Sequence, residues 1–221
     1  MTDPFAAERL LDAALTHVPF DGWSPATLAA AARDAAVDPA LAAALYPRGG
    51  LDLALAYHRR GDAAMREGLA AQNLAALRFR DRVALAVRLR LQAAERESVR
   101  RASALMALPQ NAPEAAKALW GTADAIWTAL GDASTDGNWY SKRAILAGVY
   151  GATVLYWLGD TSEGSVETWA FLDRRIEDVM RFEATKAKVR ASPVLNPVLG
   201  LPLRLLERIR APLPGGAMPG R

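Results

Sequence analysis

The chain has 221 residues and a net charge of +3, long enough to bury a substantial core. Hydrophobic residues make up 52% of it and cysteine is absent, which favours a folded domain and excludes disulfides and thiolate chemistry. The start lacks the basic and apolar regions of a signal peptide. The longest uncharged run, residues 144–159, is shorter than the roughly 20 residues of a membrane span. We therefore expect a cytoplasmic protein in which this run is a buried helix.

The charge is unevenly distributed along the chain. Residues 1–60 carry 5 basic and 7 acidic groups, whereas residues 61–110 carry 9 and 5. Residues 111–180 carry 5 basic and 10 acidic groups, and residues 181–221 carry 8 and 2. An acidic body followed by a basic tail is typical of a protein whose C-terminus meets an anionic surface.

The first 60 residues predict a unit of short helices. One helix begins near Phe5 and ends before His17. Ser24-Pro25 and Asp38-Pro39 each combine an N-cap residue with proline at the first helical position, so each starts a further helix. Gly49-Gly50 then separates the third helix from a longer fourth one.

This spacing resembles the helix-turn-helix of Tet-repressor-like regulators, in which a short third helix ends in an aromatic residue, here Tyr46. A recognition helix needs Arg, Lys, Asn or Gln to reach base edges. The third helix instead offers Asp38 and a series of alanines, and the unit has a net charge of −2. The helix spacing is typical of a DNA-binding protein, but the side chains of the third helix are not, so we expect no DNA binding.

The remainder predicts a larger helical body. Residues 73–109 form one long helix in this interpretation, although residues 83–91 alternate like a strand. Further helices are predicted over residues 114–130, 139–158 and from Val166 onward, where apolar residues recur at helical spacing. The fold class is therefore all-α, with a helix-turn-helix-like unit at 1–60, a larger helical body at 61–185 and a basic tail at 186–221.

Catalytic and metal motifs are lacking. His17 and His58 occur in no metal-binding spacing, and capping or surface roles suit them better. No phosphate-binding or nucleophile motif occurs, and Asp124 with Asp136 forms an acid/base pair only in principle. We expect a protein that is not an enzyme and holds no metal or cofactor.

Two motifs in the second half are distinctive: "TADAIW" at 122–127 and "STDGNWYSKRA" at 134–144. At these motifs and at "TWAFLDRRIEDVM" the sequence resembles the accessory lipid-binding family of ubiquinone (coenzyme Q) biosynthesis, the ninth-numbered component of that set. The resemblance covers residues 5–185. It implies a Tet-repressor-like fold that binds lipid instead of DNA, a homodimer, a C-terminal helix that touches membrane, and assistance to ring hydroxylation.

The same resemblance implies a patch that docks a di-iron hydroxylase. Residue by residue, the matching positions are Asp124, Ile126, Asp136, Trp139, Tyr140 and Arg143. Aromatic residues beside Lys142 and Arg143 are also typical of interaction hot spots. The alternative from the residues alone is that Trp139 covers the core and Asp136 caps a helix.

The helix after Trp139 mixes small residues with large apolar ones, which suits either a lipid pocket or dry helix packing. Its pocket candidates are Ile145, Val149, Leu155 and Trp157. The expected ligand is an isoprenoid quinone precursor or a phospholipid.

The tail departs from a clean amphipathic helix because Pro197 and Pro202 would each interrupt it. A short amphipathic helix after Pro202 is predicted to contact the inner face of a membrane, with folding back onto the body as the alternative. The contact candidates are Leu199, Leu203, Leu205, Leu206, Ile209, Arg204 and Arg208. The rival function from another class is a ligand-responsive transcriptional regulator.

Overall fold

The computed structural model describes residues 5–135 and 137–191, with side chains described as far as residue 181. Over this part the chain is helical and contains no strand. The α-helices are α1 (Ala6–Asp21), α2 (Pro25–Asp34), α3 (Pro39–Leu45), α4 (Gly50–Ala70), α5 (Phe79–Gln92), α6 (Arg96–Met106), α7 (Ala112–Ala129), α8 (Gly137–Gly159) and α9 (Val166–Ala191). Short 3-10 turns lie at Leu74–Ala76, Pro109–Asn111 and Glu163–Ser165. The all-α prediction is confirmed.

Two compact units make up the chain. The first contains residues 1–72 and 86–118, and the second contains residues 73–85 and 119–221. The division falls within α5 and α7, so each of these helices contributes to both units. The predicted boundary at residue 60 lies inside α4, which continues unbroken to Ala70.

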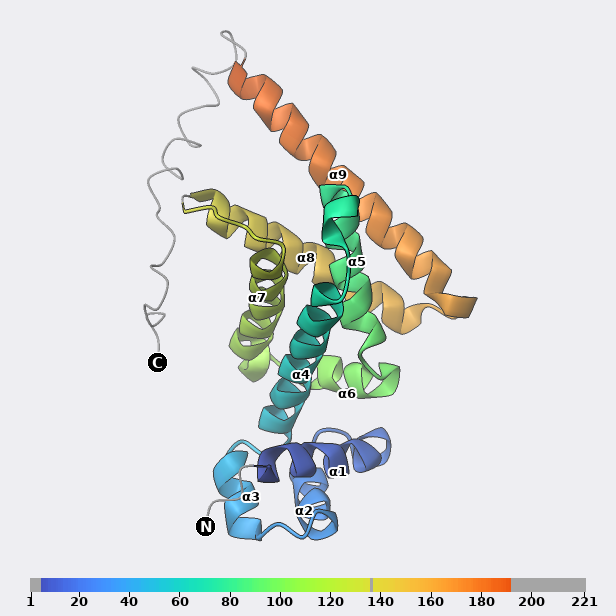
Figure 1. The fold of residues 1–221 in the computed structure, drawn as a ribbon. Helices are drawn as coiled ribbons and strands as arrows, with labels where there is room; N and C mark the ends of the chain where they lie inside the picture. Colours follow the sequence, from blue (N-terminus) through green and yellow to red (C-terminus); the bar gives the residue numbers. More distant parts are fainter. Residues whose placement is uncertain (1–4, 136, 192–221) are drawn as a thin grey trace. The chain divides into compact units, whose positions relative to one another are not determined.

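The first unit contains α1, α2 and α3 packed together at the start of α4 (Figure 1). The predicted caps form, because the Ser24 hydroxyl accepts from the Thr27 N–H and the Asp38 carboxylate accepts from Ala40 and Leu41. Leu10, Leu11, Val18 and Leu53 are among the fully buried residues of this core.

Two helix boundaries differ from the sequence prediction. Helix α1 runs through Pro19 to Asp21, beyond the predicted end before His17, although a proline there cannot donate to the Leu15 carbonyl and its ring crowds that carbonyl. The expected long helix over 73–109 is two helices, α5 and α6. Glu95 interrupts it because its carboxylate accepts from the N–H groups of Glu97 and Ser98 and thereby caps α6.

Gly50 shows why the turn into α4 requires glycine. A Cβ at this position would lie 2.2 Å from the carbonyl carbon of Trp23, closer than side-chain atoms can approach backbone. Trp23 is held in turn by its indole N–H, which donates to the Ser98 carbonyl at 2.9 Å. The course of the chain between α3 and α4 is thus determined by the close contact of Gly50 with the backbone of Trp23.

The second unit is built on α8 and α9, which pack against each other. Their buried side chains include Leu146 and Tyr150 of α8 with Leu172 and Ile176 of α9. Within the described ranges, no helix combines the length and the apolar character needed to cross a membrane.

Candidate functional site

The loop between α7 and α8 is organised by Asp132. One carboxylate oxygen accepts from the Lys142 ammonium and from the Ser134 hydroxyl, both at 2.8 Å. The other oxygen accepts from the Arg143 guanidinium at 3.0 Å. Two consecutive residues at the start of α8 therefore bind a single carboxylate in the preceding loop.

These contacts determine the ionisation of Asp132. Burial by itself would raise the pKa of its carboxyl group, but the hydrogen bonds from Lys142, Ser134 and Arg143 outweigh burial and lower the pKa to about 2. Asp132 is therefore an anion at neutral pH.

Arg143 is almost fully buried, with 3% of its side chain exposed, and connects three parts of the unit. Its Nε donates to Asp124 of α7 at 2.5 Å, and its Nη1 donates to Asp132 and to the Trp139 carbonyl. Its guanidinium carbon lies 4.0 Å from the centre of the Trp139 ring, within the range of cation–π contact. Arg143 thus holds Trp139 in position through both its backbone carbonyl and its ring.

Trp139 belongs to a cluster of three aromatic rings that we call the aromatic patch: Trp120, Trp139 and Tyr140. Trp139 and Tyr140 meet edge to face, with centroids 4.7 Å apart. Trp120 of α7 lies 5.8 Å from the Trp139 ring and 6.2 Å from the Tyr140 ring. Tyr140 is exposed and Trp139 is half-buried, so part of the patch is accessible to a partner.

The structure brings four of the six predicted docking residues together. Asp124, Trp139, Tyr140 and Arg143 lie side by side in the manner just described, and 44% of the Asp124 side chain is exposed. Ile126 is fully buried and Arg143 nearly so, and neither side chain is therefore exposed at the surface. Asp136 lies outside the described residues. Docking itself stays a prediction.

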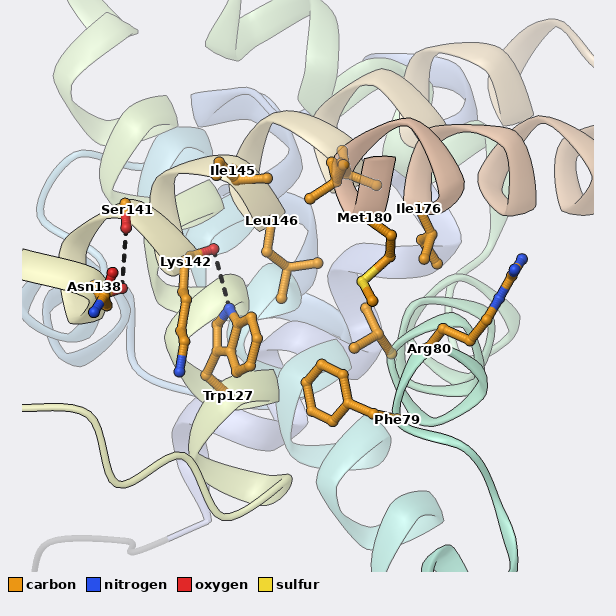
Figure 2. A pocket seen from close by; sticks show the side chains of 13 residues that line it. Phe79, Arg80, Trp127, Asn138, Ser141, Lys142, Ile145, Leu146, Ile176 and Met180 are labelled. Carbon is orange, nitrogen blue, oxygen red and sulfur yellow. Dashed lines mark hydrogen bonds between the residues drawn. The ribbon is translucent and has the colours of Figure 1, made fainter. Parts of the chain in front are cut away.

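An apolar pocket of about 260 Å³ lies within the same unit. Figure 2 shows Trp127 between Lys142 and Phe79, with Leu146, Ile176 and Met180 beside them. The pocket is lined by residues from α5, α7, α8 and α9: Phe79, Arg80, Val83, Trp127, Asn138, Ser141, Lys142, Ile145, Leu146, Val149, Ile176, Val179 and Met180. Its mainly hydrophobic lining suits an apolar ligand.

Of the four predicted pocket residues, Ile145 and Val149 line this pocket. Leu155 and Trp157 are not among its lining residues. Leu155 has 69% of its surface exposed, and Trp157 is buried. The α8 residues that line the pocket lie between Asn138 and Val149, so Leu155 and Trp157 lie beyond its end of the helix.

A second, more polar hollow of about 480 Å³ is formed by the α7–α8 loop; we call it the loop hollow. It is lined by Phe79, Trp127, Leu130, Gly131, Asp132, Ala133, Ser134 and Lys142. The indole N–H of Trp127 donates to the Lys142 carbonyl at 3.1 Å (Figure 2). The loop hollow and the apolar pocket share three lining residues, Phe79, Trp127 and Lys142.

Sequence reasoning missed three aromatic residues of the site: Trp120, Trp127 and Phe79. A signal for the first two existed, because Trp120, Asp124 and Trp127 recur at positions i, i+4 and i+7 and so lie on one face of α7. Phe79 had none, because it is separated from Trp127 by 48 positions and meets it only in the folded unit.

No group of three or more His, Asp or Glu side chains in the described ranges could hold a metal ion. His58, for which a capping or surface role was predicted, is largely buried, and its ring nitrogen Nε2 lies 3.1 Å from the Ala118 carbonyl. Burial, followed by the positive charge of Arg90, lowers the pKa of His58 to about 4. This histidine is neutral at physiological pH.

Comparison with solved structures shows the fold of the chain. The chain is similar to the TetR transcriptional regulator from Nitrosomonas europaea, with a TM-score of 0.62 and 21% sequence identity over 79% of this chain and 97% of that one. At this identity the likeness shows the fold alone. The chain is an all-α protein with a Tet-repressor-like fold, as its helix spacing predicted.

Comparison with sequences names the family. The COQ9 family model matches residues 112–183, which include the aromatic patch and α8. The chain is 36% identical to "Ubiquinone biosynthesis protein COQ9, mitochondrial" of Rattus norvegicus over 83% of this chain and 62% of the relative. The Xenopus tropicalis and Homo sapiens proteins of that name are 34% and 32% identical, over 84% and 83% of this chain and 61% and 60% of theirs. The chain is thus similar to the COQ9 family, as the resemblance predicted, and it spans about three fifths of the length of these relatives.

Proposed function

We propose that this protein is a non-catalytic, lipid-binding accessory protein of ubiquinone biosynthesis. It takes a polyprenyl quinone precursor from the membrane and presents it to a ring hydroxylase. The observation that carries the proposal is the position of the apolar pocket and the aromatic patch on one helix, α8. The names of the COQ9 relatives support the pathway.

The physical reason for such a protein is the ligand's long apolar chain. That chain holds a small ring at the membrane, and its transfer to water is costly because free energy rises with every exposed apolar group. A pocket lined by Ile145, Val149 and Met180 would replace the bilayer around part of the chain. Trp139 and Tyr140, on the same helix, would contact the hydroxylase.

Contact with the membrane and with a second copy of the chain belong to the same proposal. The membrane-contact residues, Leu199, Leu203, Leu205, Leu206, Ile209, Arg204 and Arg208, lie outside the described residues. The protein would bind the inner membrane face peripherally from the cytoplasm. A homodimer is supported by exposed apolar side chains on α8 and α9, among them Leu155, Tyr156 and Val166.

The quinone content of cells lacking the gene tests the accessory role. Mass spectrometry is expected to show loss of ubiquinone and accumulation of an under-hydroxylated precursor, and restoration of the gene is expected to reverse both. An unchanged profile would contradict the role.

Lipid binding is tested separately with purified protein. Val149→Phe is expected to fill part of the apolar pocket and reduce co-purified isoprenoid lipid several-fold. Leu108→Phe, which adds a ring at an exposed site outside the pocket, is the matched control. Equal lipid content in the two variants would exclude the apolar pocket as the binding site.

The regulator alternative is less well supported. Helix α3 occupies the position of a recognition helix, yet its residues are Pro39, Leu41, Leu45 and four alanines, which cannot donate to base edges. A gel shift at low salt separates the two functions, because a regulator discriminates its operator from random DNA.

A further inference from the structure

The apolar pocket and the loop hollow have a common wall. Phe79, Trp127 and Lys142 line both, although the two spaces otherwise differ in their residues and their polarity. The apolar pocket is bounded by aliphatic side chains of α8 and α9. The loop hollow is bounded by the α7–α8 loop with Asp132 and Ser134. A ligand with one apolar and one polar end matches this arrangement.

The wall is held in place from three helices. The rings of Phe79 of α5 and Trp127 of α7 stack with their centroids 5.5 Å apart and an interplanar angle of 27°. The Lys142 ammonium lies 5.2 Å from the centre of the Trp127 ring, and the Lys142 carbonyl accepts from the Trp127 indole. A flat ring placed beside this wall would meet aromatic faces, with which aromatic rings pack favourably.

The polar groups of the loop hollow select the kind of head group. Lys142 has three N–H donors, and its two described hydrogen bonds go to Asp132 at 2.8 Å and to Ser134 at 2.6 Å. The third N–H of the Lys142 ammonium can therefore donate to an oxygen of a ligand. Its charge is balanced by the Asp132 carboxylate, which lines the same hollow.

This charge balance disfavours an anionic head. A phosphate group in the hollow would meet one cation and one carboxylate, and the repulsion from Asp132 would offset the attraction to Lys142. Arg143 does not add a second accessible cation, because its side chain is buried and bonded to Asp124 and Asp132. An uncharged ring with an oxygen substituent needs only one donor and an aromatic wall.

We propose that the loop hollow is a head-group site for an uncharged phenol or quinone ring, stacked against Phe79 and Trp127 and hydrogen-bonded by Lys142, while the ligand's chain lies in the apolar pocket. This inference rests on the proposed lipid-binding function and deepens it. It assigns discrimination between a phenolic lipid and a phospholipid to the residues of the shared wall.

The test compares three probes in detergent micelles with the full chain: a farnesyl-substituted phenol, the saturated hydrocarbon of the same chain, and a short-chain phosphatidylglycerol. Binding is followed by quenching of tryptophan fluorescence and by competition. Lys142→Met is expected to weaken binding of the phenol about tenfold, the effect of losing a hydrogen bond from a charged donor. Its binding of the hydrocarbon is expected to stay unchanged.

Two further variants keep the test interpretable if Lys142→Met folds poorly. Phe79→Leu retains an apolar side chain and removes the stacked ring, so it is expected to weaken only the phenol, several-fold. Lys117→Met removes an exposed lysine that lines neither space, and it is expected to bind all three probes as the original chain does.

The outcomes separate this inference from the function on which it rests. If the original chain binds the hydrocarbon and Val149→Phe abolishes that binding, lipid binding in the apolar pocket holds. If the preference for the phenol then survives in both Lys142→Met and Phe79→Leu, the head-group site is overturned. A larger loss of phosphatidylglycerol than of phenol in Lys142→Met overturns it in favour of a phosphate head. Binding of none of the probes overturns both proposals.

Discussion

Each of the two units contains an arginine–aspartate pair that is almost fully buried. In the first unit the Arg90 Nε lies 2.7 Å from Asp62 Oδ1, and in the second the Arg143 Nη1 lies 3.0 Å from Asp132 Oδ2. The pairs differ in what their remaining hydrogen bonds reach. Arg90 donates to the His58 carbonyl within α4, whereas Arg143 holds the exposed aromatic patch. The same kind of ion pair links α5 to α4 in the first unit and supports the aromatic patch in the second.

Space around the two pairs differs as well. A Cβ on Gly61 would lie 2.3 to 2.9 Å from atoms of the Arg90 guanidinium, so α4 leaves room for that side chain only because residue 61 is glycine. Arg143 instead packs against the Trp139 ring, and its partner Asp124 is partly exposed. The Arg90 guanidinium thus lies close to the backbone of α4, whereas the Arg143 guanidinium lies against a side chain that is itself partly exposed.

The largest effect is expected when the enclosed pair is broken. Arg90→Leu leaves Asp62 as an uncompensated buried charge and is expected to lower the free energy of unfolding by about 3–5 kcal/mol, measured by urea denaturation. Replacing both residues by leucine is expected to restore part of this loss. A double variant less stable than Arg90→Leu would contradict this interpretation.

The enclosed pair also predicts a pH dependence through its neighbour His58. The pKa of His58 is about 4 in the folded protein, below its ordinary value of 6.5, so the unfolded chain binds more protons between these two pH values. Stability is fully present above pH 6.5 and is expected to decline by on the order of 3 kcal/mol toward pH 4. His58→Gln should flatten the urea midpoints over this range. If the urea midpoints of His58→Gln fell with pH as steeply as those of the original chain, a group other than His58 would be responsible for the decline.

Breaking the pair beneath the surface is expected to cost less. In Arg143→Met the Asp132 carboxylate keeps Lys142 and Ser134, and Asp124 can turn to solvent, so a loss of about 2 kcal/mol is expected. Because Trp139 also loses its support, binding of the hydroxylase should fall more than stability does. Arg174→Met, which removes an exposed arginine, is the control. Full hydroxylase binding by Arg143→Met would show that the patch does not need this support.

Asp132 places the second pair in a different pH range. Its folded pKa of about 2 is below the ordinary value of 3.8, so its contribution to stability is present above pH 3.8 and is lost as the pH falls toward 2. The first unit should therefore lose stability between pH 6.5 and 4 through His58, and the second between pH 3.8 and 2 through Asp132. Urea denaturation of Asp132→Asn is expected to show a smaller decline between pH 4 and 2 than the original chain. An equal decline would exclude Asp132 as its source.

The smallest effect on stability is expected at the outer face. Trp139 is half-buried, so Trp139→Ala is expected to cost about 1 kcal/mol in unfolding experiments but to abolish hydroxylase binding and lower ubiquinone. Phe20→Ala removes an exposed aromatic ring outside the patch and should change neither. Retention of both hydroxylase binding and ubiquinone in Trp139→Ala would falsify the docking role.

The sequence predicted the parts of this comparison that depend on local signals. Ser24 and Asp38 were readable as helix starts because a cap and the following proline lie side by side in the chain. Glu95 was not, because it stood inside an apparently continuous helical pattern. Trp139 and Tyr140 were found through a motif of consecutive residues. The sequence did not predict the wall shared by the two spaces, because Phe79 and Trp127 come together only through tertiary packing.

The position of Asp132 constrains how the protein can change over evolutionary time. One oxygen of this carboxylate orients Lys142 toward the loop hollow, and the other orients Arg143 beneath the aromatic patch. A substitution of Asp132 would therefore disturb both the proposed head-group site and the proposed docking surface. On the proposed function, a change in ligand preference made at Asp132 would also change the docking of the hydroxylase, unless a second substitution restored the support of Arg143.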